Sequence, residues 1–131
     1  MRRELQPHGW RRPRGYSNGL AAQGIQIYIA GQIGSSEREE LVSDDFAQQS
    51  AEALRNVVAV LACAGAKPEH LVRMTWYVTD KREYAASSKA VGEAYREIVG
   101  DTYPAMTLVQ VAALLDDRAK VEIEATAVVP A

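Results

Sequence analysis

The spacing of apolar residues predicts one long helix in the first half of the chain. Apolar side chains recur at three- and four-residue intervals, at Ala47, Ala51, Leu54, Val58 and Leu61. This spacing is typical of an amphipathic helix. Asp45 precedes the pattern, Gln48 follows three residues later as in a capping box, and Gly65 is a suitable C-cap. We therefore predict a helix between Asp45 and Gly65.

A second stripe with helical spacing lies between Asp80 and Gly100. Its members are Tyr84, Ser88, Val91, Tyr95 and Ile98. Asp80 is a residue type that starts helices, and Gly100 is one that ends them. We predict one continuous helix here and interpret the stripe as core packing rather than a cofactor site.

Alternation of apolar and polar residues predicts strands in the rest of the chain. The alternating segments are residues 25–30, 71–79, 103–111 and 121–127. Segment 103–111 begins beside Pro104, where a missing N–H does least harm to a strand ladder. Its alternation places Met106 and Leu108 on one face and Thr107 and Val109 on the other.

The predicted elements follow the order ββαβαββ, which describes one α+β domain over residues 15–131. We expect residues 20–22 and 25–30 to pair as a hairpin about the turn at Gln23-Gly24. Two helices after a hairpin can cover only one face of the sheet. The other face would present aromatic, hydroxyl and acidic side chains, namely Tyr28, Thr75, Tyr77, Glu122 and Glu124. This mixture is too polar for a core and too aromatic for a bare surface, so we infer an oligomer that buries it.

Residues 1–14 hold five arginines, two prolines and little periodicity, which indicates an extended N-terminal arm. One interpretation is a solvated, partly mobile terminus. The other is that an arginine near Tyr16 enters a binding cleft. Arg14 is the candidate, because side chains two residues apart in an extended segment project to the same side.

Composition and charge exclude several classes of protein. The chain has 131 residues, of which 47% are hydrophobic and 24% charged, as expected for one ordered domain. Its net charge of −2 argues against a general nucleic-acid binder. No apolar run approaches the roughly 18 residues of a membrane span. No apolar segment follows Arg2 and Arg3, so a signal peptide is not expected. The single cysteine, Cys63, cannot form an internal disulfide, so a cytoplasmic chain is the simplest interpretation. His8 and His70 lie far apart in the sequence, and no metal-ligand spacing links them.

The chain resembles the Rid family, also called the YjgF, RutC-like or reactive-intermediate deaminase family. The matching blocks keep their order and spacing from residue 15 onward, and are Gly15-Tyr16-Ser17, residues 29–33, 49–56, 64–65 and 74–80, Tyr103-Pro104-Ala105, and residues 121–125. The resemblance implies a chorismate-mutase-like α+β fold and a homotrimer whose sheets form a central barrel. It also implies small-molecule sites in the clefts between subunits, where enamines and imines are hydrolysed to keto acids and ammonia without metal or cofactor.

The resemblance also assigns candidate site residues. Tyr16 corresponds to the tyrosine of the cleft, Gly31 to the glycine whose backbone lines it, and Glu122 to the glutamate that holds the attacking water. Met106 replaces the arginine that binds the substrate carboxylate, and methionine offers neither charge nor donors. Ser88 stands where active members often have asparagine. The usual activity on 2-imino acids is therefore not expected.

Three functions follow from these residues. The first is hydrolysis of a small enamine or imine outside the usual amino-acid-derived set, with Glu122 as general base. The second is a non-catalytic trimer that binds a small molecule, with Glu122 a structural glutamate and Tyr16 an ordinary interface tyrosine. In both, Met106 forms an apolar wall that favours a less polar ligand. The third, an RNA-cleaving role sometimes attributed to the family, is disfavoured by the net charge and by the lack of a stacking platform.

Overall fold

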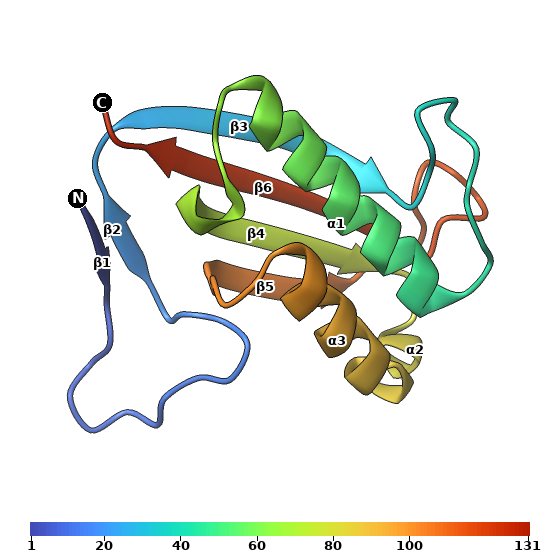
Figure 1. Cartoon of the computed structure of the whole chain (residues 1–131). Helices are drawn as coiled ribbons and strands as arrows, with labels where there is room; N and C mark the ends of the chain where they lie inside the picture. The colour runs from blue at the N-terminus through green and yellow to red at the C-terminus, as the bar shows by residue number, and fades with distance from the viewer.

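A four-stranded mixed sheet forms the centre of the molecule (Figure 1). The computed structural model describes residues 1–131. The strands of the sheet, in their spatial order, are β3 (Ile25–Ile33), β6 (Val121–Val129), β4 (Leu71–Val78) and β5 (Ala105–Gln110). β4 and β5 are parallel, whereas β6 is antiparallel to both of its neighbours. The four alternating segments of the sequence therefore form the four strands of one sheet.

The predicted first helix is confirmed as α1 (Phe46–Cys63). Its N-cap is Asp45, whose carboxylate accepts a hydrogen bond from the backbone N–H of Gln48 at 3.0 Å. Leu54, Val57 and Leu61 are fully buried on the face that packs on the sheet. The short 3-10 helix η1 (Pro68–His70) then leads into β4.

The single helix expected after Asp80 is two helices, α2 (Lys81–Ala86) and α3 (Ser88–Ile98). The helical turn breaks at Ser87, where ψ is 8° and the backbone N–H is shared between two carbonyl groups. Two consecutive serines are weak helix formers, because their hydroxyls compete for backbone hydrogen bonds. The break lets α2 contact β4 through Tyr84 while α3 packs along α1.

A short strand lies within the predicted N-terminal arm. Residues Arg2–Glu4 form a strand, β1, which pairs antiparallel with β2 (Leu20–Ala22). The expected hairpin between β2 and β3 is wrong, because β2 pairs with β1 in a separate small sheet. The chain turns sharply at Gly24, where φ is 149° and a Cβ atom would lie 2.1 Å from the Val129 carbonyl oxygen. A glycine is therefore required at the point where the chain passes from one sheet to the other.

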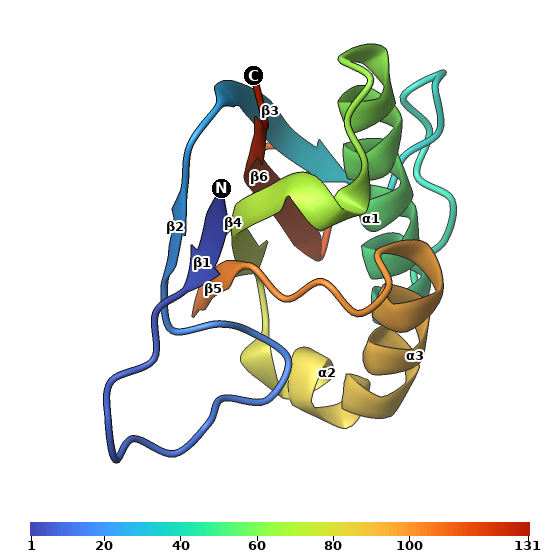
Figure 2. The same cartoon turned by 60° about the vertical axis from the view of Figure 1, so that its left-hand side comes forward.

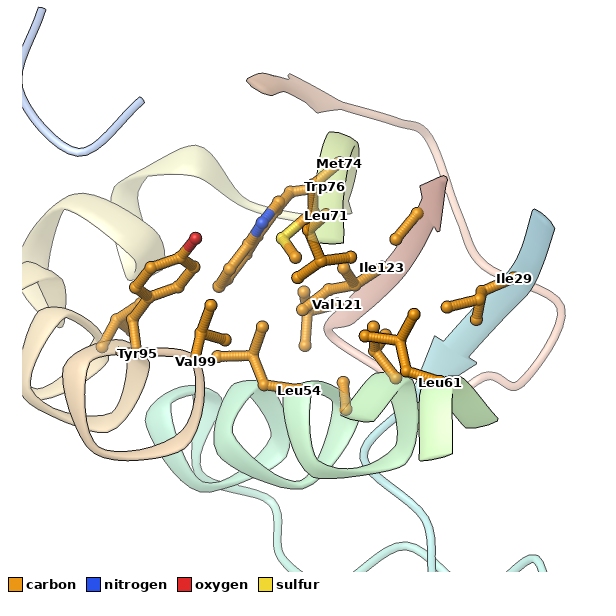
Figure 3. Close-up of a cluster of buried hydrophobic side chains, with 14 of the residues drawn as sticks. Ile29, Leu54, Leu61, Leu71, Met74, Trp76, Tyr95, Val99, Val121 and Ile123 are labelled. Atoms are coloured by element: carbon orange, nitrogen blue, oxygen red, sulfur yellow. The ribbon is translucent and has the colours of Figure 1, made fainter. Parts of the chain in front are cut away.

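The hydrophobic core lies between the sheet and its helices. Figure 2 shows α1 and α3 on the same side of the sheet, with β1 and β2 away from them. Side chains from the sheet and both helices meet in one buried cluster, and ten of them are labelled in Figure 3. None of the helices combines the length and apolarity needed to cross a lipid bilayer.

No helix covers the opposite face of the sheet. Tyr28 is 72% exposed there, and Val109 is 41% exposed. The Tyr77 hydroxyl donates a hydrogen bond to the Glu124 carboxylate on this face, which raises the pKa of Tyr77. The arrangement of polar and aromatic residues on an open face is the one that the sequence predicts. The homotrimer that would cover it stays a prediction.

Candidate functional site

A cavity of about 390 Å³ lies where β5, α2, α3 and the segment before β2 meet. Its volume falls within the roughly 300–1,000 Å³ typical of small-molecule sites. Most of its lining side chains are apolar or aromatic, and the polar ones are few. This composition is typical of a site that binds an organic ligand rather than an ion alone.

The sheet contributes the apolar floor of the cavity. In the parallel pairing of β4 with β5, Met106 lies beside Met74 and Leu108 beside Trp76. Met74 and Trp76 are buried on the helix-covered face, so Met106 and Leu108 point to that face as well. Met106, Leu108 and Trp76 all line the cavity.

Ser17 fixes the segment before β2 to the start of β5. Its backbone N–H donates to the Pro104 carbonyl oxygen at 3.0 Å, and its hydroxyl donates to the Tyr103 carbonyl oxygen at 2.5 Å. Gly15, at a φ of 78°, turns the chain just before this anchor. The result is that Arg14 and Tyr16 both line the cavity, although they lie in a segment without regular structure.

Aromatic residues form the wall on the helical side. Tyr95 of α3 stacks on Tyr103, with ring centroids 5.6 Å apart and planes 11° from parallel. The Tyr95 hydroxyl donates to the Thr102 carbonyl oxygen at 2.6 Å, and burial raises the pKa of Tyr95. Tyr84 of α2 meets Trp76 edge to face, at a centroid distance of 6.2 Å.

Trp76 is 2% exposed, and its indole N–H has no hydrogen-bond partner in the chain. A buried donor without an acceptor costs roughly 1–3 kcal/mol, so the core tolerates this cost at the cavity wall.

The cavity has positive charge and no negative charge of its own. Arg14 and Arg96 line it, and no Asp, Glu or His does. Neither arginine takes part in any of the ion pairs of the chain. An acidic ligand group would therefore meet two guanidinium groups, but no side chain that could act as a general base at neutral pH.

Four of the residues singled out in the sequence come together here. Arg14, Tyr16, Ser88 and Met106 all line the cavity. Ser88 is the first residue of α3, and faces the same cavity as Tyr84 of α2. Arg14 and Tyr16 thus lie at the same cavity, and the binding of a ligand by an arginine of the N-terminal segment stays a prediction.

Gly31 and Glu122 lie elsewhere, on the helix-free face. They are close to each other, because a Cβ atom built on Gly31 would lie 2.0 Å from Oε2 of Glu122. β3 has a register shift between Ile29 and Gln32, which brings the Gly31 backbone against this carboxylate. The Glu122 side chain is half-buried and forms no ion pair within the chain. Within one chain, Glu122 and Met106 are thus on opposite faces of the sheet.

Sequence reasoning missed most of the aromatic wall and one arginine. Tyr84 and Tyr95 were expected in the core, and each also borders the cavity. Arg96 was assigned no role. Its position relative to Ser88 was an available signal, since residues eight apart on a helix lie on nearly the same face. No group of His, Cys, Asp and Glu side chains is arranged to hold a metal ion.

Comparison with known families gives a match over most of the chain. A family model described as Endoribonuclease L-PSP matches residues 11–129. The 2-iminobutanoate/2-iminopropanoate deaminase of Escherichia coli is 37% identical over 105 residues, which cover 80% of each chain. The human protein of the same name is 34% identical over 103 residues, which cover 78% of this chain and 72% of that protein.

Solved structures give the same result. YyfB of Yersinia pestis, described as a protein of unknown function of the conserved Rid family, superposes with a TM-score of 0.86 at 30% identity, and 98% of each chain is covered. The YjgF gene product of E. coli superposes with a TM-score of 0.71 at 34% identity, covering 86% of this chain and 87% of that one. These matches bear out the family resemblance seen in the sequence.

Proposed function

Because the chain belongs to the endoribonuclease L-PSP family, which includes the Rid and YjgF proteins, we propose that it hydrolyses the C=N bond of a small imine, or of the imine tautomer of a small enamine. The observation that supports this most is the cavity at β5, which Tyr16, Ser88 and Met106 line together. The relatives of this chain include proteins named as deaminases of 2-iminobutanoate and 2-iminopropanoate. A cytoplasmic location, predicted from the sequence, suits this chemistry.

The proposed site needs a second copy of the chain. The cavity itself offers no carboxylate, whereas Glu122 lies on the open face of the sheet beside Gly31. In a homotrimer that covers the open faces, Glu122 of the partner subunit would stand at the cavity of its neighbour. A site divided between subunits explains why the binding and catalytic residues lie on opposite faces of a single chain.

Hydrolysis of an imine needs a positioned water, a group that accepts its proton, and groups that orient the substrate. The imine reacts with its nitrogen protonated: Glu122 holds a water and accepts its proton as the water oxygen bonds to the imine carbon, giving a neutral carbinolamine. Glu122 then returns this proton to the nitrogen, the C–N bond breaks, and ammonia leaves as the hydroxyl oxygen forms the C=O bond and gives its proton to Glu122. Tyr16 and Ser88 offer hydroxyls that can orient the substrate. No step requires a metal or a cofactor.

Met106 determines which substrates suit the site. A carboxylate beside Met106 would meet a thioether that carries no charge and no donor. We therefore expect poor hydrolysis of the short 2-imino acids, and better hydrolysis of substrates with a larger apolar part.

The experiment is an ammonia-release assay on imines formed in situ by an amino-acid oxidase. Imines derived from alanine, 2-aminobutyrate, leucine and phenylalanine form the series, and the buffer rate is subtracted from each. Release above that rate that disappears in Glu122→Gln would support hydrolysis. Light scattering on the same samples tests the homotrimer, and a mass of 14.3 kDa would contradict it.

A non-catalytic binding trimer is the second candidate function. It is favoured by the absence of an acidic or basic catalyst among the residues that line the cavity. Saturable binding of a small molecule without hydrolysis of any imine in the series would support this candidate over the first.

A further inference from the structure

Two arginines reach the cavity from different elements, and neither is neutralised by the chain. Arg14 comes from the segment before β2, and Arg96 from the last turn of α3. Both are exposed, and neither forms an ion pair. Because the lining contains no Asp or Glu, the cavity is a positively charged site within a chain of net charge −2.

The guanidinium group of Arg96 lies close to Gly92, one helical turn away on α3. Ser88, Gly92 and Arg96 follow one another at four-residue intervals on one face of α3. A Cβ atom on Gly92 would lie 3.5 Å from Nη1 of Arg96, so the guanidinium group lies over the glycine. Side chains on a helix lean toward its N-terminus, which here is the end at Ser88. The guanidinium of Arg96 therefore lies along α3 at the edge of the cavity, where it is exposed and open to a ligand.

Arg14 is positioned by the anchor at Ser17. Two hydrogen bonds join Ser17 to the backbone that precedes β5, at 3.0 Å and 2.5 Å. Gly15 turns the chain between Arg14 and Tyr16 with a positive φ. The other arginines of the N-terminal region, such as Arg11, do not line the cavity. Arg14 is thus the one guanidinium of this region that is placed to meet a ligand.

The rest of the lining is too large and too apolar for a short acid. Stacked Tyr95 and Tyr103 face the cavity, together with Val91, Met106 and Leu108. A ligand of three or four carbons would leave most of this apolar surface in contact with water. An aromatic or similarly bulky body would cover it, at a gain of roughly 25 cal/mol for each Å² removed from water.

We infer that the cavity binds a monocarboxylate with an aromatic body, held at its acid group by Arg14 and Arg96. These two arginines would supply the charge that Met106 does not. The inference rests on the cavity being the ligand site of the proposed function, and it names the class of ligand. An arginine fork suits a carboxylate better than a neutral group, and aromatic walls suit a flat ring.

Three related probes measure separately what the aromatic ring and the acid group contribute to affinity. 3-Phenylpropanoate has both the ring and the acid, propanoate lacks the ring, and 3-phenylpropan-1-ol lacks the acid. Calorimetric titration of the full-length protein should give the tightest binding for 3-phenylpropanoate, by about tenfold or more over either partial probe. Equal affinity for propanoate, or equal competition by inorganic phosphate, would overturn the inference.

The location of binding can be read from tryptophan fluorescence. The chain has two tryptophans, of which Trp10 is 62% exposed and Trp76 is 2% exposed in the cavity wall. In Trp10→Phe, Trp76 is the only tryptophan. Its emission should therefore change as 3-phenylpropanoate is added, and the Kd from this titration should equal the Kd from calorimetry. Calorimetric binding without such a change would place the ligand elsewhere and contradict the inference.

Arginine variants test the anchor. Arg14→Ala and Arg96→Ala should each lower the affinity for 3-phenylpropanoate by about five- to tenfold and leave the affinity for 3-phenylpropan-1-ol unchanged. Arg11→Ala is the matched control, because it removes the same charge from the same region without touching the cavity. Equal small losses of affinity in all three variants would indicate a diffuse electrostatic effect. They would contradict specific binding of the carboxylate by Arg14 and Arg96. Thermal unfolding of each variant confirms that the fold is intact.

These measurements are independent of turnover. Arginine-dependent binding without hydrolysis of any imine would refute the proposed catalysis and leave the inference standing. If imines are hydrolysed but 3-phenylpropanoate inhibits the reaction no better than propanoate or 3-phenylpropan-1-ol, the proposed catalysis stands and the inference is refuted.

Discussion

The carboxylate of Glu122 occupies the space that a side chain at Gly31 would need. A Cβ atom on Gly31 would lie 2.0 Å from Oε2 of Glu122 and 2.8 Å from its carboxyl carbon. A glycine at this position therefore allows one orientation of the glutamate. The relationship was not visible in the sequence, where the two residues are far apart and each was assigned a role separately.

Gly31→Ala should displace the Glu122 carboxylate without unfolding the protein. The clashing atoms belong to a flexible side chain on an open face, so we expect a loss of stability within about 1–2 kcal/mol. If Glu122 is the general base, imine hydrolysis should fall by about 10²-fold, in the range of a lost acid–base catalyst. Ammonia release and thermal unfolding measured on the same sample separate the two effects. A variant with unchanged turnover would show that the orientation of Glu122 does not matter.

Met106→Arg should raise the hydrolysis of short 2-imino acids. The new guanidinium would supply a charge-assisted pair worth about 1.5–3 kcal/mol, or roughly ten- to a hundredfold in kcat/KM. Met106→Lys is a control with the same charge but no planar fork, and should gain less. Rates for the alanine-derived imine that stay at the wild-type level would mean that residue 106 does not set the substrate preference.

Ser17→Ala should loosen the segment that holds Arg14 and Tyr16. It removes the hydrogen bond from the hydroxyl to the Tyr103 carbonyl oxygen, which is worth about 0.5–1.5 kcal/mol of stability. Affinity for 3-phenylpropanoate should fall as well, because the freed segment must be ordered again on binding. Ser36→Ala, in an exposed loop away from the cavity, is the control. Equal effects of the two changes would contradict the anchoring role.

The sequence predicted the parts of the fold that repeat a pattern over many residues. α1 has a long apolar stripe and a capped start, and the strands of the main sheet alternate clearly, so these elements were confirmed. β1 and β2 contain three residues each, which is too short for alternation to give a signal. Their pairing with each other depends on the path of the chain through Gly24, which no local pattern records.

The site was predictable only in part, because some of its residues meet through contacts between distant segments. Strand alternation correctly placed Met106 and Leu108 on the same face of their strand, because the direction of side chains has a period of two. It did not indicate that this face is the one opposite to Glu122. Arg96 was missed because an exposed arginine near a helix end is ordinary, and only the packing of α3 beside β5 places it at a cavity. Contacts between distant segments decide such positions, and a single sequence does not report them.

Tyr95 should make the stability of the fold sensitive to high pH. Burial raises the pKa of Tyr95, since the tyrosinate would be charged in a poorly solvated wall, and its hydroxyl donates to the Thr102 carbonyl oxygen at 2.6 Å. The contribution of this group is complete below the unfolded pKa of about 10, and is lost as the pH rises from there through the raised folded pKa. In that window the unfolded chain releases one proton more than the folded chain, so the free energy of unfolding should fall by about 1.4 kcal/mol per pH unit from this residue.

Tyr95→Phe tests this directly. The variant keeps the ring that stacks on Tyr103 but has no ionisable hydroxyl. It should lose about 1 kcal/mol at neutral pH with the hydrogen bond, and its stability should then decline less steeply above about pH 10 than that of the wild type. The measurement is urea unfolding at a series of alkaline pH values, with tyrosinate absorbance recorded in parallel. Parallel declines for the two proteins would show that the buried hydroxyl of Tyr95 is not the group that makes the wild-type fold sensitive to alkali.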